Sequence, residues 1–193
     1  MITNQQNEKL IAKQSDLLQD LLQKLTLERE KTQLELLKKE KKIQQQKAQR
    51  IVKNHVLSGS AIGLIPFPFV DTFALSANQI NMTLHLSEHY KLDFDKKRAK
   101  IILIALVSGS LPTFTVLGLS SVVKLIPGIG TLGGNASLSI LGGAITYATG
   151  QSFVKHFEAG GTLHNFHARN YVDFFKQKLK EGQQYSTKIF SYQ

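Results

Sequence analysis

The chain has 193 residues, a formal net charge of +10 and no cysteine. Without cysteine it has no disulfide, no thiolate nucleophile and no cysteine metal ligand. Residue types are unevenly spread, because residues 1–53 are rich in Lys, Glu and Gln whereas Ile101 to Val154 contain a single charged residue, Lys124. A polar extension followed by an apolar domain is therefore expected, with no signal peptide before them.

The polar extension is predicted to be one long helix. Residues Glu8 to Lys53 contain no Gly or Pro and consist largely of strong helix formers. Apolar residues follow alternating steps of three and four, the seam of a coiled coil, at Ile11, Leu18, Leu22, Leu25, Leu36 and Ile43. Arg29, Thr32 and Lys39 interrupt this seam. The pattern favours pairing with a second copy or a coiled-coil partner, or folding back onto the apolar domain; a solvated linker helix is the alternative.

The end of this extension is strongly basic. Its cations are Lys38, Lys39, Lys41, Lys42, Lys47, Arg50 and Lys53. Nucleic-acid-binding modules usually add aromatic side chains for stacking, and residues 1–53 contain none. The basic cluster adjoins the first apolar segment, where lipid-facing lysines are common. We therefore expect contact with an anionic membrane surface and no nucleic-acid partner, with a solvated basic face as the alternative.

The segment LIPFPFVDTFAL, Leu64 to Leu75, breaks one apolar helix and begins another. Pro66 and Pro68 favour an extended backbone, because proline biases the preceding residue away from helix. Asp71 suits the N-cap of the next helix, where a carboxylate accepts backbone N–H bonds at the positive end of the helix dipole. A buried functional carboxylate is the alternative role for Asp71.

The short motif HLSEH raises the possibility of a zinc site. His85 and His89 share one helix face, as two zinc ligands must, Glu88 would activate water, and Glu158 is a candidate third ligand. An amphipathic helix that buries its leucines explains the same residues. Because short motifs often match by chance, no metal is predicted.

Two uncharged segments, Ile101 to Val123 and Leu132 to Val154, flank a KLIPGIG turn that contains Pro127, Gly128 and Gly130. The first segment is long enough, as a helix, to cross a hydrocarbon core of about 30 Å. The second is of similar length but a much weaker candidate, because it contains Asn135, Gln151 and several Ser and Thr residues, and together the two predict a helical hairpin. Basic residues flank the hairpin, so its two ends would lie in the cytoplasm if it spans a bilayer. The alternative is a soluble helical protein that buries the hairpin completely.

The second arm carries a stripe of small residues that predicts close helix packing, at Ser139, Gly142, Gly143, Thr146 and Gly150. GIGTLG matches a dinucleotide-binding pattern only formally, since no acid follows at the required distance and no sheet is expected. The chain has no P-loop and no nucleophile-elbow motif. We predict no catalytic activity and no cofactor.

The C-terminal region is predicted to form an amphipathic helix from His164 to Glu181. Gly182 is its expected stop, because glycine is common just after the last helical residue. Residues 183–193 would then form a tail.

Three motifs, in this order, resemble the YcjF-like domain of unknown function: IPFPFVD at Ile65 to Asp71, KLIPGIG at Lys124 to Gly130, and G-x-x-F-x-x-x-F-E-x-G-G at Gly150 to Gly161. That domain often follows an Era-like small GTPase in bacterial proteins, and the resemblance covers about Ile51 to Lys180. It implies a bacterial, mostly helical, membrane-associated domain, here without the GTPase, which would be a separate partner. By resemblance, the structural or interaction residues are Pro66, Pro68, Asp71, Pro127, Gly128, Gly130, Phe157, Glu158 and Gly160.

The sequence thus predicts an all-α protein with a coiled-coil-like helix over 1–53, a YcjF-like apolar helical domain over 54–182 and a tail over 183–193. The predicted function is a non-enzymatic, membrane-associated anchor, scaffold or partner-recruiting module on the cytoplasmic side of a bacterial inner membrane. A pore-forming or membrane-permeabilising effector is one alternative. A zinc hydrolase that uses HLSEH is the other.

Overall fold

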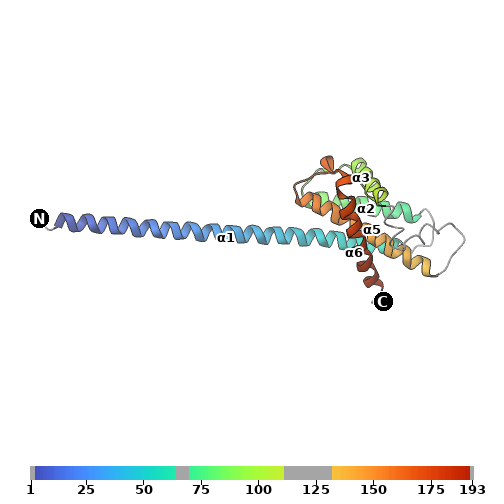
Figure 1. The fold of residues 1–193 in the computed structure, drawn as a ribbon, viewed down its shortest axis with the longest axis horizontal. Helices are drawn as coiled ribbons and strands as arrows, with labels where there is room; N and C mark the ends of the chain where they lie inside the picture. Colours follow the sequence, from blue (N-terminus) through green and yellow to red (C-terminus); the bar gives the residue numbers. More distant parts are fainter. Residues whose placement is uncertain (1–2, 64–69, 111–131, 192–193) are drawn as a thin grey trace. The chain divides into compact units, whose positions relative to one another are not determined.

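The computed structural model describes residues 3–63, 70–110 and 132–191 (Figure 1). Every element in these ranges is helical and no strand occurs among them, which confirms the predicted all-α fold. The chain divides into two compact units, Met1–Gln46 and Lys47–Gln193, and the division falls inside the first helix. The predicted domain boundaries at 1–53, 54–182 and 183–193 stay a prediction.

The first unit is the N-terminal part of α1, a 60-residue helix over Thr3–Ile62. The helix predicted for Glu8 to Lys53 is therefore present and extends to Ile62. Every side chain from Gln6 to Gln44 is exposed. The exposed set includes the predicted seam, with Leu18 at 59% and Leu25 at 61% exposure. Helix propensity and local pairs such as Lys24 with Asp20, 2.7 Å apart, stabilise this stretch in place of burial.

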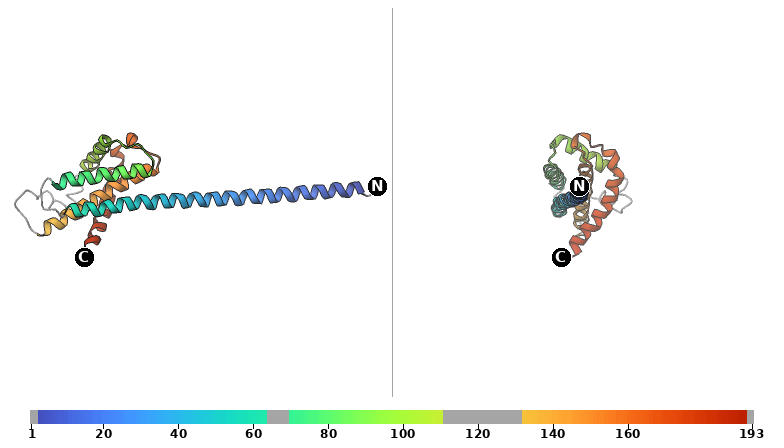
Figure 2. Two further views of the ribbon diagram at one scale, coloured as in Figure 1. Left: turned by 180° about the vertical axis from the view of Figure 1, so that it is seen from behind. Right: turned by 90° about the vertical axis from the view of Figure 1, so that its left-hand side faces the viewer.

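Four of the helices that build the core of the second unit are the last turns of α1, α2 (Val70–His89), α5 (Leu132–Glu158) and α6 (Val172–Ser191). Each contributes two fully buried apolar residues four positions apart: Val52 and Val56, Met82 and Leu86, Ala144 and Ala148, Phe175 and Leu179. Residues i and i+4 lie above one another on one helix face, so each pair forms a stripe. α2 and α5 lie beside the last turns of α1 (Figures 1 and 2), and α5 also packs along α6.

α3 (Lys96–Gly109) begins at an N-cap that the residue types favour. The Asp95 carboxylate accepts hydrogen bonds from the backbone N–H groups of Lys97 at 2.8 Å and Arg98 at 3.1 Å. The Arg98 N–H is the main reason that the pKa of Asp95 lies below its usual value. This cap fixes the first turn of α3, so the helix begins before the predicted arm at Ile101.

The predicted hairpin is only partly within the described residues. α3 covers the beginning of its first arm, and residues 111–131, which include Pro127, Gly128 and Gly130, lie outside the described ranges. The second arm is α5, which is helical as predicted and buries most of its side chains within the second unit from Ser139 onward. Among the described ranges, no helix combines the length and the apolar composition needed to cross a bilayer.

Both predicted ends of the C-terminal helix, His164 and Glu181, are wrong. Two short 3₁₀ helices, Leu163–Asn165 and Ala168–Tyr171, occupy the stretch where the helix was expected to begin. α6 then starts at Val172 and continues through Gly182 to Ser191. A Cβ at Gly182 would lie 2.9 Å from the Ala144 carbonyl oxygen and 2.9 Å from the Tyr147 Cβ. Gly182 thus allows α6 to approach α5 and does not end the helix.

Candidate functional site

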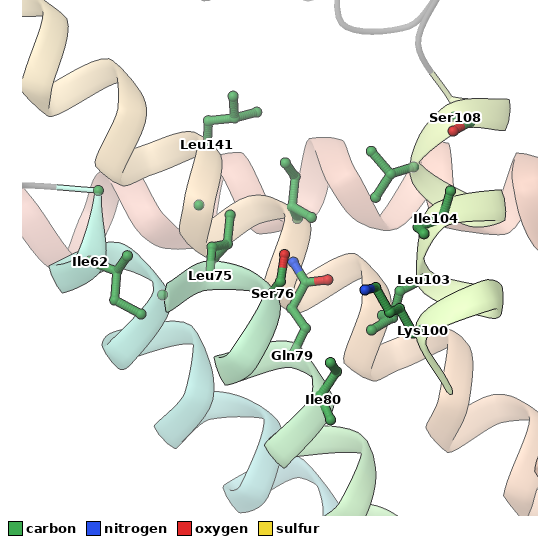
Figure 3. Close-up of a pocket in the computed structure, with 15 residues that line it drawn as sticks. Ile62, Leu75, Ser76, Gln79, Ile80, Lys100, Leu103, Ile104, Ser108 and Leu141 are labelled. Atoms are coloured by element: carbon green, nitrogen blue, oxygen red, sulfur yellow. The ribbon is translucent and has the colours of Figure 1, made fainter. Parts of the chain in front are cut away.

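A pocket of about 420 Å³ lies in the second unit, between the last turns of α1 and helices α2, α3 and α5 (Figure 3). Its walls are largely apolar, formed by Ile62, Leu75, Ile80, Leu103, Leu141 and Ile145. This volume falls within the range of about 300 to 1,000 Å³ that is usual for small-molecule sites. The pocket is therefore the candidate binding site of the described chain.

Three of the polar side chains in this apolar lining lie near one another, while a fourth, Ser108 of α3, lies apart from them (Figure 3). Ser76 and Gln79 come from α2 and Lys100 comes from α3. In the view of Figure 3 the Gln79 amide lies between the other two groups, with its nitrogen on the side of the Ser76 hydroxyl and its oxygen on the side of the Lys100 ammonium. Such convergent polar groups in an apolar pocket are what orients a bound small molecule.

Two of these groups have no protein partner within the described ranges. Gln79 is 5% exposed, yet its side-chain amide makes no hydrogen bond to a described residue. The ion pairs of the described residues do not include Lys100. The pocket therefore offers both an unsatisfied amide and an unpaired cation.

The sequence analysis did not identify this pocket. The available signal was Gln79, which stands on the buried stripe of α2, four residues after Leu75 and three before Met82. A polar residue at such a position departs from the apolar periodicity of the helix, and buried polar side chains are informative.

The structure places His85 beside another histidine, His55 of α1. His55 Nε2 lies 3.0 Å from His85 Nδ1, and His55 Nδ1 lies 2.9 Å from Asn78 Oδ1. The Asn78 Nδ2 donates to the His55 carbonyl oxygen at 2.9 Å, which fixes the orientation of the amide. Burial is the main cause that lowers the pKa of His55; the nearby His85 lowers it further and the Asn78 hydrogen bond opposes the shift.

The remaining candidate zinc ligands have other neighbours. The His89 ring contacts the Tyr90 ring edge-on, with centroids 5.0 Å apart. Glu158 accepts a hydrogen bond from the Tyr90 hydroxyl at 3.2 Å, and burial, with this carboxylate beside it, raises the pKa of Tyr90. Within the described ranges, no three His, Cys, Asp or Glu side chains are grouped so as to hold a metal ion. The described part of the chain therefore contains no metal site formed by His85, His89 and Glu158.

The third motif of the predicted family, Gly150 to Gly161, surrounds a buried histidine that the sequence analysis did not single out. His156 Nδ1 lies 2.9 Å from the Tyr171 hydroxyl, and its Nε2 lies 2.9 Å from both the Thr162 carbonyl oxygen and Asn165 Oδ1. Because both acceptors face Nε2, the geometry assigns the proton to Nε2 and makes Tyr171 the donor to Nδ1.

The glycines of this motif have separate structural reasons. Gly160 has φ +80°, a left-handed conformation that favours glycine. A Cβ at Gly161 would lie 2.2 Å from His156 Nε2, so only glycine lets the ring pack there. Phe157 is 5% exposed and packs against the Phe153 ring. The motif thus positions the turn after α5.

The small-residue stripe of α5 makes the close contacts that its sequence predicts. A Cβ at Gly142 would lie 2.6 Å from the Gly59 carbonyl oxygen on α1, and one at Gly150 would lie 2.7 Å from Val52 Cγ2. The Ser139 hydroxyl donates to the Ser60 carbonyl oxygen. Helix backbones therefore approach each other directly along this stripe.

Several predicted residues can be placed only in part. Pro66 and Pro68 lie outside the described ranges. α2 begins at Val70, so Asp71 is the second residue of the helix and not the residue before it.

The seven predicted membrane-surface cations are all exposed: Lys38, Lys39, Lys41, Lys42, Lys47, Arg50 and Lys53. The first four belong to the first unit and the last three to the second. Among the described residues, none of them takes part in an ion pair. Their exposure is equally compatible with membrane contact and with solvation.

Comparisons with known proteins identify the family of the chain. A family described as Domain of unknown function (DUF697) matches residues 27–184, a range that begins upstream of the predicted start at Ile51. Magnetosome membrane protein 22 of Magnetospirillum gryphiswaldense is 33% identical over 143 residues, which cover 74% of this chain and 73% of that protein. No solved structure matches the chain significantly. DUF697 is the domain associated with YcjF-like proteins, so the predicted resemblance is confirmed and the chain belongs to the DUF697 family.

Proposed function

We propose that this chain is a non-enzymatic, membrane-associated helical protein that acts as an anchor or scaffold on the cytoplasmic side of a bacterial inner membrane. In this proposal the second unit contacts the membrane, and the first unit recruits a second copy or a coiled-coil partner. The relative in Magnetospirillum gryphiswaldense is named as a membrane protein, which supports the assignment.

The observation that carries the proposal is the exposed face of α3. Ile101 is 66% exposed and Ile104 is 57% exposed. The exposed Lys97 and Lys100 lie on the same helix face as these isoleucines, because positions 97, 100, 101 and 104 are spaced i, i+3, i+4 and i+7. Apolar side chains between lysines favour the boundary between lipid headgroups and acyl chains.

The first unit supports the recruiting role. Its leucines are exposed along a helix that has no other element beside it within that unit. A seam with alternating three- and four-residue spacing is typical of a helix that pairs with another helix. A second copy supplies such a helix, and a separate GTPase is the other partner that the family context suggests.

Vesicle co-sedimentation of the purified full chain tests the membrane role. We expect binding to vesicles that contain anionic phospholipid and weaker binding to neutral vesicles, since each lysine near an anionic surface contributes about 1 kcal/mol. Ile101→Ser should lower the affinity about tenfold or more, because burying such a side chain is worth about 1.5 to 3 kcal/mol. Ile101 does not line the pocket, so this variant leaves the candidate site intact.

Leu57→Ser is the matched control, because Leu57 is an exposed apolar residue on α1, 48% exposed. It should bind vesicles as the unchanged chain does. Recovery of the full chain in the supernatant with both kinds of vesicle would contradict the proposal. Release of an encapsulated dye on binding would instead favour the pore-forming alternative, since an anchor leaves the bilayer sealed.

A further inference from the structure

We propose that the pocket binds a single-chain amphiphile, a hydrocarbon chain that ends in a carboxylate or phosphate. The acyl chain would occupy the apolar part of the pocket, and the anionic head would contact Gln79, Ser76 and Lys100. This inference does not depend on membrane association, because a monomeric amphiphile in water is a sufficient ligand.

The Gln79 amide is the first reason. The amide makes no hydrogen bond to a described residue, and it is not among the fully buried side-chain atoms that lack a partner, so it is open to the pocket, where a ligand or water satisfies it. Gln79 is more than nine-tenths buried, and its amide points into the pocket (Figure 3). An oxygen of a carboxylate or phosphate accepts a hydrogen bond from this N–H₂ group, and the Ser76 hydroxyl offers a second donor.

The charge at the pocket is the second reason. Lys100 is the ionisable side chain in the described lining, and no carboxylate accompanies it there. Its ammonium points toward the Gln79 amide, whose oxygen lies on the side of Lys100 and whose nitrogen lies on the side of Ser76 (Figure 3). A negative group beside the ammonium is therefore bound by a charge-assisted hydrogen bond from Lys100. The polar end of the ligand is therefore an anion.

The walls are the third reason. Apart from Ser108, the side chains around the remaining volume are branched aliphatic residues from four helices, among them Ile62, Leu75, Leu103 and Ile145. They offer no hydrogen bonds to a sugar or a nucleobase, and they favour hydrocarbon through apolar burial. Gly59 and Gly142 bring α1 and α5 into contact at the edge of this volume, which closes the pocket with backbone on that side.

Titration of the full chain with decanoate, below its micelle-forming concentration, tests the inference by calorimetry. Decanol is the uncharged comparison ligand with the same chain. Lys100→Met should weaken decanoate binding about tenfold or more, because it removes a charge-assisted hydrogen bond, and should leave decanol binding unchanged. Gln79→Leu should also weaken decanoate binding, while Lys97→Met, an exposed lysine one turn earlier on α3, should change neither ligand.

Native mass spectrometry after incubation with phospholipid vesicles distinguishes the source of the ligand. A bound lysophospholipid would support the pocket as a site for single-chain lipids, and decanoate binding alone would support it as a site for free fatty acids. Absence of both, or an equal loss of decanoate affinity in Lys97→Met and Lys100→Met, would overturn the inference. None of these outcomes depends on whether the full chain sediments with vesicles. The co-sedimentation experiment therefore detects failure of the proposed membrane role separately.

Discussion

The two ends of α1 have opposite burial although they belong to one helix. From Gln6 to Gln44 every side chain is exposed, including leucines and isoleucines at seam positions. From Ala48 to Ser60 the helix buries Ala48, Val52 and Val56 completely, and Gly59 and Ser60 contact α5. The apolar residues of the first stretch are larger, yet those of the second form the core.

The difference shows that side-chain size and spacing decide burial here more than hydrophobicity. Small residues at four-residue steps let the α1 backbone approach α5, with Gly59 opposite Gly142. Leucines separated by lysines and glutamates give a seam at alternating spacing, which fits another long helix. The second stretch is therefore built for the interior of the domain, and the first would bury its seam only against the partner helix that we propose.

The largest expected effect comes from placing a charge on each stretch. Val52→Asp introduces a carboxylate at a fully buried position and should lower the free energy of unfolding by about 3 to 5 kcal/mol. Leu22→Asp places the same charge on the exposed seam, where the free energy of unfolding of the domain should change by less than about 0.5 kcal/mol. Denaturant unfolding followed by circular dichroism measures both.

The same pair of variants separates stability from self-association. Leu22→Asp should shift the full chain toward the monomer in light scattering after size exclusion, because an acid in a coiled-coil seam opposes pairing. Equal losses of stability in the two variants, at a protein concentration where the chain is monomeric, would show that the seam is buried within one chain, and the contrast between the two ends of α1 would then be wrong.

A smaller effect distinguishes two kinds of glycine in the second unit. Gly142→Ala should cost about 2 to 3 kcal/mol, because its Cβ would lie 2.6 Å from the Gly59 carbonyl oxygen and backbone must move. Gly160→Ala should cost about 1 kcal/mol, since its Cβ meets no atom within 4 Å and only the positive φ opposes it. Thermal unfolding of the two variants under identical conditions tests this order. A reversed order would mean that α1 and α5 are not in backbone contact at this point.

Periodicity and composition were sufficient for much of the fold. The lack of Gly and Pro between Glu8 and Lys53 predicted the long helix, and the small-residue stripe predicted the close contact of α5. Gly182 was misread, because glycine serves both as a helix stop and as a point of close approach, and only the neighbour at Ala144 distinguishes them. The start of α6 was missed because the His156 interactions, which order the preceding 3₁₀ turns, join residues from two different elements.

The candidate site was harder to predict than the fold. Pocket walls come from four helices, and no spacing within one segment shows that Gln79 and Lys100 face each other. The HLSEH motif suggested zinc because two histidines share a helix face. The partner of His85 is instead His55, 30 residues earlier on a different helix.

The smallest expected effect is the pH dependence that this histidine pair adds to the buried end of α1. Neutral His55 donates from Nδ1 to Asn78 Oδ1 and accepts at Nε2 from His85 Nδ1–H. Burial keeps its pKa in the folded protein below the ordinary value of 6.5. The unfolded chain therefore binds more protons at this residue as the pH falls through 6.5, and the free energy of unfolding decreases.

His55→Gln removes this ionisable group, so the fall in stability between about pH 6.5 and the lower folded pKa should become shallower than in the unchanged chain. Denaturant unfolding at a series of pH values measures the slope. His167→Gln is the control, because His167 is exposed and its side chain makes no capping hydrogen bond, so its slope should match that of the unchanged chain. An unchanged slope in His55→Gln would place His55 in water and contradict the packing of α2 against this part of α1. A shallower slope in His55→Gln alone would show that the buried end of α1 responds to acid through the burial of His55.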